Sequence, residues 1–184
     1  MVDNKELDVV HQLGNGIRTV RKQAGLTMEQ LSKKSGVSVL TIGNIENGRT
    51  NPTINILWKL SNALDMTLSQ LVGYSNISNA VSKVTSNYFM NDLSSGLLVQ
   101  PVFQEDNIEV YRVCLKANSV NLAKHQPKGS VEVLTVMSGK ISIKIEGKQY
   151  DLDTYDTINF DSGMVHEYRN MSDEDALLNI VVKY

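Results

Sequence analysis

The sequence predicts a protein of two domains, an α-helical domain followed by a small antiparallel β-barrel or sandwich. In the first third of the chain apolar residues recur at helical spacing, whereas Ile141, Ile143 and Ile145 alternate with polar residues. The charge also changes sign along the chain. Residues 14–59 hold seven basic and two acidic side chains, and the residues from 75 onward hold ten basic and fourteen acidic ones. We therefore expect a basic domain that meets phosphate and an acidic domain that does not.

Composition narrows the class of protein. A hydrophobic content of 41% is typical of a globular chain with one or two cores. No apolar run approaches the ~20 residues that span a bilayer, and the acidic, polar start is unlike a signal peptide. Cys114 is the single cysteine, so no internal disulfide can form. These features predict a cytoplasmic protein that does not contact a membrane.

The first domain is expected over residues 8–73. Apolar residues at helical spacing mark one helix around 9–20 and another around 54–64, and a short last helix is expected at 68–72. Two more helices are expected between the helix around 9–20 and the helix around 54–64.

Those two helices form a turn motif with polar caps. Thr27 and Gln30 form a capping box at the start of the first helix. Gly36 supplies the left-handed backbone that the turn needs. Ser38 then caps the second helix, which is expected to run to about Glu46. The arrangement lets one helix enter a DNA major groove while the other braces it.

The second domain is expected over residues 95–184, after a linker at 74–94 in which Ser, Asn and Thr dominate. In the segment KISIKIEGKQYDL, Glu146-Gly147 supplies a tight hairpin turn between two strands. Many short strands at regular spacing are typical of a small antiparallel barrel or sandwich. The other strands are expected at 97–103, 108–116, 130–137, 156–160, 164–169 and 176–183.

Residues 13–72 resemble the phage-repressor-like (XRE) helix-turn-helix family, which has a five-helix, lambda-repressor-like fold. The matching segments are RTVRKQAGLTMEQLSKKSGVS, TIGNIENGRTNP and ILWKLSNALDMTLSQL, in this order. The resemblance implies that the second helix of the motif enters the major groove of double-stranded DNA. It also implies a homodimer on a pseudo-palindromic operator, and an internal ion pair between Arg21 and Glu46.

The resemblance places the candidate DNA-binding residues on the groove helix and beside it. Val39, Leu40, Gly43 and Asn44 are expected to face base edges, where Asn44 can pair with adenine. Val39 and Leu40 can contact only thymine methyl groups or contribute through shape, so part of the specificity is expected from DNA deformability. Helix starts and the following loop are expected at phosphates. The candidates for these phosphate contacts are Thr27, Met28, Ser38, Asn47 and Arg49. Thr41 is a further candidate DNA-binding residue.

Residues 97–183 resemble the cupin family, whose fold is a double-stranded β-helix or jelly-roll barrel. The resemblance is carried by His125, Glu132 and Gly139 in a first motif and by Gly163, His166 and Asn170 in a second. Pro127 replaces the second histidine that metal-binding cupins have in the first motif. The resemblance still implies that His125, Glu132 and His166 could hold a divalent metal such as zinc or iron. Alternatively, these residues hydrogen-bond a small organic ligand or only fill the barrel.

Two further residues are candidates for the ligand pocket. Tyr168 is expected on the same strand face as His166. Arg112 is either an edge residue whose charge reaches solvent or a clamp for the carboxylate of an effector.

Together these features predict a DNA-binding transcriptional regulator, and more specifically a repressor. Its barrel is expected to bind a small-molecule effector or a metal and to support dimerisation. One alternative is a constitutive dimeric regulator with a purely structural barrel. A metal-dependent cupin enzyme is the other, and Pro127 and the lack of a further acid–base pair argue against it. We therefore expect a protein that is not an enzyme.

Overall fold

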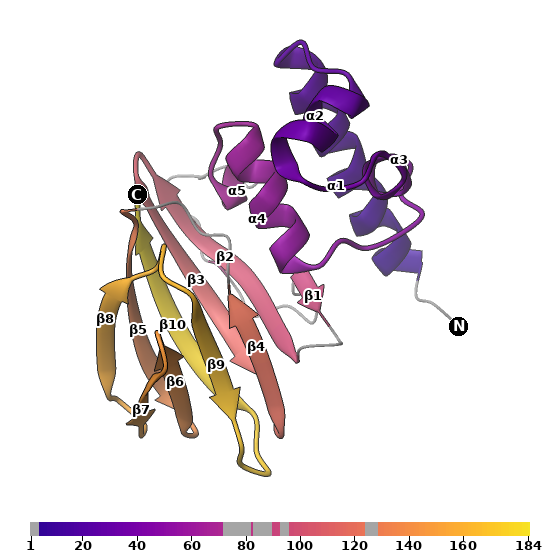
Figure 1. The fold of residues 1–184 in the computed structure, drawn as a ribbon. Coiled ribbons are helices and arrows are strands. Elements are labelled where there is room, and N and C mark those ends of the chain that lie inside the picture. Colours follow the sequence, from indigo (N-terminus) through magenta and orange to yellow (C-terminus); the bar gives the residue numbers. More distant parts are fainter. Residues whose placement is uncertain (1–3, 72–81, 83–89, 93–95, 124–128) are drawn as a thin grey trace. The chain divides into compact units, whose positions relative to one another are not determined.

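The computed structural model divides into two compact units, Met1–Ser75 and Asn76–Tyr184. It describes residues 4–71, 82, 90–92, 96–123 and 129–184. The first unit holds the helices and the second holds the strands (Figure 1). The predicted fold class, a helical domain followed by a β domain, is confirmed. None of the helices in the described ranges is long and apolar enough to cross a membrane.

The helical unit contains five helices, and polar caps fix the starts of three of them. They are α1 (Asn4–Gln23), α2 (Met28–Ser35), α3 (Val39–Glu46), α4 (Ile54–Ala63) and α5 (Leu68–Leu71). Thr27, Ser38 and Thr53 have extended backbones at the N-caps, and each side chain accepts a hydrogen bond from the N–H three residues on. Gly36 ends α2 in the left-handed region with a φ of 69°. These caps agree with the sequence prediction.

One hydrophobic core joins the five helices. Each helix contributes a side chain that is fully buried, namely Ile17, Leu31, Ile42, Leu57 and Leu68. Because α3 is only eight residues long, its position depends on this packing more than on helix propensity.

Helices α1 and α3 approach each other closely at Gly14. A Cβ atom at this position would lie 2.2 Å from the carbonyl oxygen of Ile45, which is backbone and cannot move aside. The close approach therefore requires glycine, and it sets how α3 sits on α1.

The second unit is built of two antiparallel sheets. Sheet A has the strand order β1-β2-β3-β10-β5-β8, and sheet B has the order β4-β9-β6-β7. The strands of sheet A are β1 (Met90–Asp92), β2 (Leu97–Glu105), β3 (Ile108–Leu115), β10 (Ala176–Lys183), β5 (Val131–Ser138) and β8 (Thr157–Asp161). Those of sheet B are β4 (Ser119–Ala123), β9 (His166–Asn170), β6 (Ile141–Ile145) and β7 (Lys148–Leu152).

Most strands lie where the alternation of the sequence predicts them. The β6–β7 turn has positive φ at Glu146 (46°) and Gly147 (90°), as a two-residue hairpin turn of type I′ requires. Strand β4 was not expected, and β1 falls within the expected linker at 74–94 and pairs with β2. Most of that linker lies outside the described residues, so the domain boundaries stay a prediction.

Burial alternates along the strands and defines the inside of the barrel. Tyr111, Leu134, Ile143 and Leu178 are buried inward-facing residues on four different strands. Polar residues share this inward side with them, and they form the site described next.

Candidate functional site

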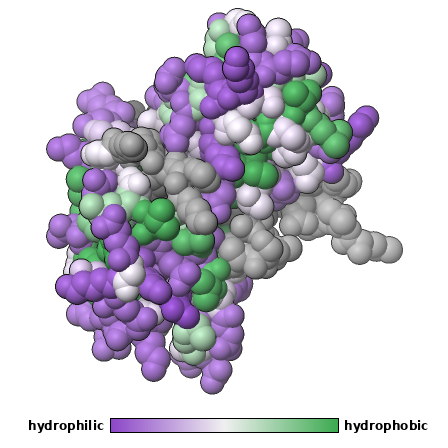
Figure 2. Space-filling view, viewed as in Figure 1, coloured by the Kyte–Doolittle hydropathy of each residue, from purple (hydrophilic) through white to green (hydrophobic). Residues whose placement is uncertain are grey.

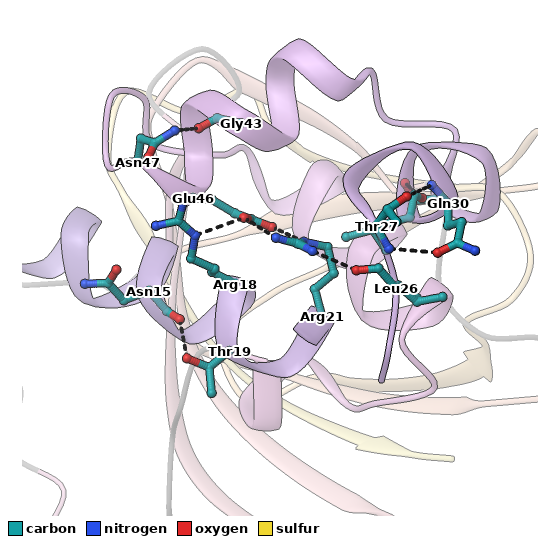
Figure 3. A network of polar contacts seen from close by, with 12 residues as sticks. Asn15, Arg18, Thr19, Arg21, Leu26, Thr27, Gln30, Gly43, Glu46 and Asn47 are labelled. Atoms are coloured by element: carbon teal, nitrogen blue, oxygen red, sulfur yellow. Dashed lines mark hydrogen bonds and ion pairs between the residues drawn. The ribbon is translucent and has the colours of Figure 1, made fainter. Parts of the chain in front are cut away.

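An ion pair between α1 and α3 fixes the helix that is expected to enter DNA (Figure 3). Arg21 Nε and Nη2 donate to Glu46 Oε1 and Oε2 at 2.6 and 2.8 Å, and Nη1 donates to the Leu26 carbonyl at 2.7 Å. Both charged side chains are buried. The hydrogen bonds to Glu46 raise the pKa of Arg21, which stays charged. The predicted pair is present, and Arg21 therefore has a structural role.

The polar groups around α3 are largely used within the motif. Thr27 and Gln30 form the predicted capping box (Figure 3). Ser38 Oγ accepts the Thr41 N–H at 3.1 Å and lies 2.7 Å from the Thr41 hydroxyl. Asn47 Nδ2 donates to the Gly43 carbonyl at 2.7 Å. These side chains stabilise the helix starts and ends before any ligand is bound.

The face of α3 that points away from the core is unusually apolar. Leu40 is 75% exposed and Val39 is 37% exposed, while Ile42, Ile45 and Glu46 on the other face are buried. Hydrophobic atoms accordingly reach the surface of the helical unit in Figure 2. Of the remaining candidates, Gly43, Asn44, Thr41 and Met28 are half-buried, and Thr27, Ser38, Asn47 and Arg49 are exposed.

In the barrel, two of the three expected ligand residues meet through a tyrosine. Glu132, His166 and Tyr168 are 0, 1 and 3% exposed. The Tyr168 hydroxyl donates to Glu132 Oε1 at 2.5 Å and lies 3.0 Å from His166 Nε2. Burial, reinforced by the Glu132 carboxylate, raises the pKa of Tyr168 well above its usual value. The phenol therefore keeps its proton. His125 lies outside the described residues.

His166 is held through both of its ring nitrogens. Nε2 lies 3.0 Å from the Tyr168 hydroxyl, and Nδ1 lies 2.9 Å from the Met164 carbonyl. Since a carbonyl only accepts, Nδ1 is the donor in the second contact.

The two candidate metal ligands that the structure describes are turned towards a phenol. Glu132 Oε1 and His166 Nε2 both face the Tyr168 hydroxyl. Within the described ranges no group of three or more His, Cys, Asp or Glu side chains could hold a metal.

A second buried carboxylate lies on the same inner face of sheet A. Glu109 is fully buried and accepts hydrogen bonds from the hydroxyls of Tyr111 and Tyr184, both at 2.5 Å. Glu109 and Glu132 both pair with Val182, so they stand in one row across three strands, about 10 Å apart. Burial raises the pKa of Tyr184, and the nearby carboxylate of Glu109 raises it further. The sequence prediction missed Glu109, although its spacing from Tyr111 places both on one strand face.

Arg112 does not line the barrel. It alternates with the buried residues Tyr111 and Val113 and therefore lies on the outer face of β3. Its Nη1 donates to Gln100 Oε1 at 2.7 Å, and Nη2 donates to the Ser82 carbonyl at 3.5 Å. The expectation that Arg112 belongs to the pocket is corrected. Arg112 is not at the edge of the sheet either, because β3 lies between β2 and β10.

Comparison with known proteins gives the same two parts. The helix-turn-helix family matches residues 17–71, and the cupin domain family matches residues 111–183. The HTH-type transcriptional regulator SutR of Escherichia coli is 22% identical over 175 residues, which cover 94% of each chain. The uncharacterized HTH-type transcriptional regulator y4dJ of Sinorhizobium fredii is 33% identical over 66 residues, or 36% of this chain and 86% of that one.

A solved structure shares the complete fold. An HTH_3 family transcriptional regulator from Vibrio cholerae superposes with a TM-score of 0.78 at 22% identity, over 97% of this chain and 98% of that one. Fold and sequence together define a helix-turn-helix protein with a C-terminal cupin domain. The chain belongs to the HTH-type transcriptional regulators.

Proposed function

We propose that this chain is a homodimeric repressor that reads a pseudo-palindromic operator with α3 and releases or retains it according to an effector in the barrel. The observation that carries the proposal is the two-sided use of α3. Its inner face is fixed to α1 by Glu46 and Ile45, and its outer face presents Val39, Leu40 and Asn44 to solvent. Such a helix is held rigidly enough to read base edges.

Phosphate contacts would position α3 in the groove. The start of α3 favours anions, because helix N-termini present backbone N–H groups and no acidic residue lies in its first turn, beside the exposed Ser38. Thr27 is exposed at the start of α2, whose first turn carries Glu29. Arg49 is exposed in the loop after α3 and adds a positive charge. These contacts set affinity and register, whereas the outer face of α3 sets sequence preference.

The DNA-binding part of the proposal is tested by salt and sequence dependence. Duplexes selected from a random library by the full chain are titrated at several salt concentrations. Arg49→Ala should weaken binding to all duplexes alike and reduce the salt slope by about 1. Asn44→Ala should change the preferred base, by about 1–3 kcal/mol if the amide makes a bidentate contact. Failure to enrich any duplex would contradict the proposal.

The barrel is proposed to bind a small organic effector at Glu132, Tyr168 and His166. The support is that three buried polar side chains form one connected chain on the inner side of the barrel. We propose no catalytic role for this site. By linkage, an effector that weakens DNA binding must itself bind more weakly to the DNA-bound protein.

The effector site is tested by its separation from DNA binding. Native mass spectrometry and metal analysis of the purified full chain identify what the barrel retains. Glu132→Gln should leave operator affinity unchanged and abolish the response to a retained compound. A stoichiometric metal, or an unchanged response in this variant, would contradict an organic effector at this position.

Dimerisation is proposed through the outer face of sheet A. Cross-strand pairing places Val110, Val181 and Val133 in one row of this face, and Ile108, Lys183 and Val131 in the next. Such apolar outer positions are unusual for a sheet that faces water. The second row ends in Glu105 beside Ile108 and Asp161 beside Val131. A central lysine between two acidic ends is complementary to a second copy of itself.

A pair of matched valines tests this surface. Val131 on sheet A and Val120 on β4 of sheet B are 42 and 41% exposed. Val131→Asp should convert the dimer to a monomer in analytical ultracentrifugation, whereas Val120→Asp should leave it intact. A monomeric wild type, or a Val131→Asp dimer of unchanged stability, would rule this surface out.

A further inference from the structure

We infer that thymine methyl groups in the operator, contacted by Val39 and Leu40, provide most of the base discrimination of α3. The inference rests on the proposed DNA binding and names the chemical feature that would give it specificity.

The position and exposure of these two side chains carry the first step. Both lie in the first turn of α3, and residues at the start of a recognition helix contact base edges. Leu40 is 75% exposed, and its side chain is dispensable for a core to which α3 contributes Ile42 and Ile45. An aliphatic side chain on this surface gains free energy only when a partner removes it from water.

Elimination of the polar side chains carries the second step. The hydroxyls of Ser38 and Thr41 bind each other, and the Ser38 oxygen also caps α3. Asn47, the C-cap residue, uses one of its two amide N–H groups to bind the Gly43 carbonyl, which holds this side chain against the end of the helix. On the outward face of the helix, Asn44 is left to make hydrogen bonds with bases. One amide can recognise one adenine, which is too little to define a half-site.

The third step concerns the shape of the same surface. Gly43 follows Val39 by one helical turn, and a Cβ atom there would meet only Met28 Sδ, at 3.9 Å. The protein itself therefore does not require glycine at this position. Its absence of a side chain lowers the helix surface beside Val39 and Leu40, so that a group projecting from the groove can reach them. The C5 methyl group of thymine is the apolar group that projects into the major groove.

Deoxyuridine substitution tests the inference with single-methyl resolution. Deoxyuridine keeps the pairing of thymidine and lacks only the methyl group. Starting from a duplex selected by the full chain, each thymidine of a half-site is replaced in turn, and affinity is measured by fluorescence anisotropy. At one or more positions we expect binding to weaken about four-fold for each methyl group that Val39 or Leu40 covers. A methyl group added at another position, by replacing a cytosine with 5-methylcytosine, should not restore the lost affinity.

Three variants separate a methyl contact from an effect of DNA shape. At each sensitive position either Leu40→Ala or Val39→Ala should reduce the deoxyuridine penalty towards one-fold, because the methyl group has lost its partner. Met171→Ala removes a side chain of similar exposure, 65%, from the β unit and should retain the full penalty.

Three results would overturn the inference. Affinity that is unchanged by deoxyuridine at every position, while the selected duplex still binds, would contradict methyl recognition alone. An equal deoxyuridine penalty in wild type, Leu40→Ala and Val39→Ala would assign the effect to DNA shape. If no duplex is selected at all, the proposed DNA binding fails, and the inference fails with it.

Discussion

The outer face of α3 and the interior of the barrel distribute polar and apolar side chains in opposite ways. On α3, Leu40 and Val39 face water while the neighbouring polar groups are used inside the motif. In the barrel, Glu109 and Glu132 are fully buried together with tyrosine hydroxyls. Each region departs from the usual rule of apolar inside and polar outside. Such departures are expected where a protein binds a partner, so the comparison locates one candidate site in each unit.

The largest effect is expected in the framework that presents α3. Glu46→Ala leaves the buried Arg21 without its carboxylate and should cost about 3–5 kcal/mol of unfolding free energy. Urea denaturation followed by circular dichroism measures this loss. Arg18→Ala is the control. Arg18 Nε also lies near the same carboxylate, 3.5 Å from Glu46 Oε2, but the Arg18 side chain is 44% exposed, so its removal should cost much less. Equal losses in both variants would show that the buried pair does not support α3.

A smaller effect is expected when the barrel chain is interrupted. Tyr168→Phe removes the hydroxyl that lies between Glu132 and His166 and should destabilise the barrel by about 1–3 kcal/mol. Affinity for the operator in the absence of effector should not change. Tyr150→Phe, on a half-buried tyrosine of β7, should shift stability by less than about 0.5 kcal/mol. A Tyr168→Phe barrel as stable as wild type would remove the basis for a connected polar site.

Alkaline pH should weaken the barrel through the same tyrosines. Their pKa values are raised in the folded state, so unfolded tyrosine loses its proton near pH 10 while Tyr168 and Tyr184 retain theirs. The contribution of each tyrosine to the unfolding free energy is therefore complete below pH 10. Above pH 10 it falls by about 1.4 kcal/mol for each pH unit. Unfolding free energies between pH 9 and 11 measure the slope, which Tyr168→Phe should reduce. An unchanged slope in that variant would contradict the buried, protonated phenol.

The smallest change in stability should accompany a clear loss of DNA binding. Gly43→Ala adds a Cβ atom where the protein has room, so it should stabilise α3 by about 1 kcal/mol. The same methyl group raises the surface that meets DNA and should lower operator affinity. Gly14→Ala is the contrasting variant, because its Cβ atom would collide with the Ile45 carbonyl and destabilise the unit. If Gly43→Ala binds DNA as wild type does, close approach at this position is excluded.

Local signals made the helical motif predictable. The Thr27–Gln30 capping box, the left-handed Gly36 and the Ser38 cap depend on residues three or four apart, and all are present. The β6–β7 hairpin was predictable for the same reason, since Glu146-Gly147 determines its turn. The Arg21–Glu46 pair joins distant positions, and only the family resemblance pointed to it.

Long-range pairing limited what could be predicted of the barrel. Tyr168 bridges Glu132 and His166 only because β5 and β9, in different sheets, face each other across the interior. Glu109 joins the site through the register of β3 with β10, which the alternation of one strand does not contain. Alternation did place Glu132 and Tyr168 inward. Applied to β3, it also puts Arg112 on the outer face, away from the pocket.

Operator affinity measured in two matched variants tests the division of roles most directly. The same selected duplex is titrated with wild type, Leu40→Asp and Glu132→Gln in the absence of effector. The account predicts a loss of at least about ten-fold for Leu40→Asp, equivalent to about 1.4 kcal/mol, and no change for Glu132→Gln. Equal affinities for all three proteins, or a loss confined to Glu132→Gln, would contradict the claim that α3 reads DNA and the barrel does not.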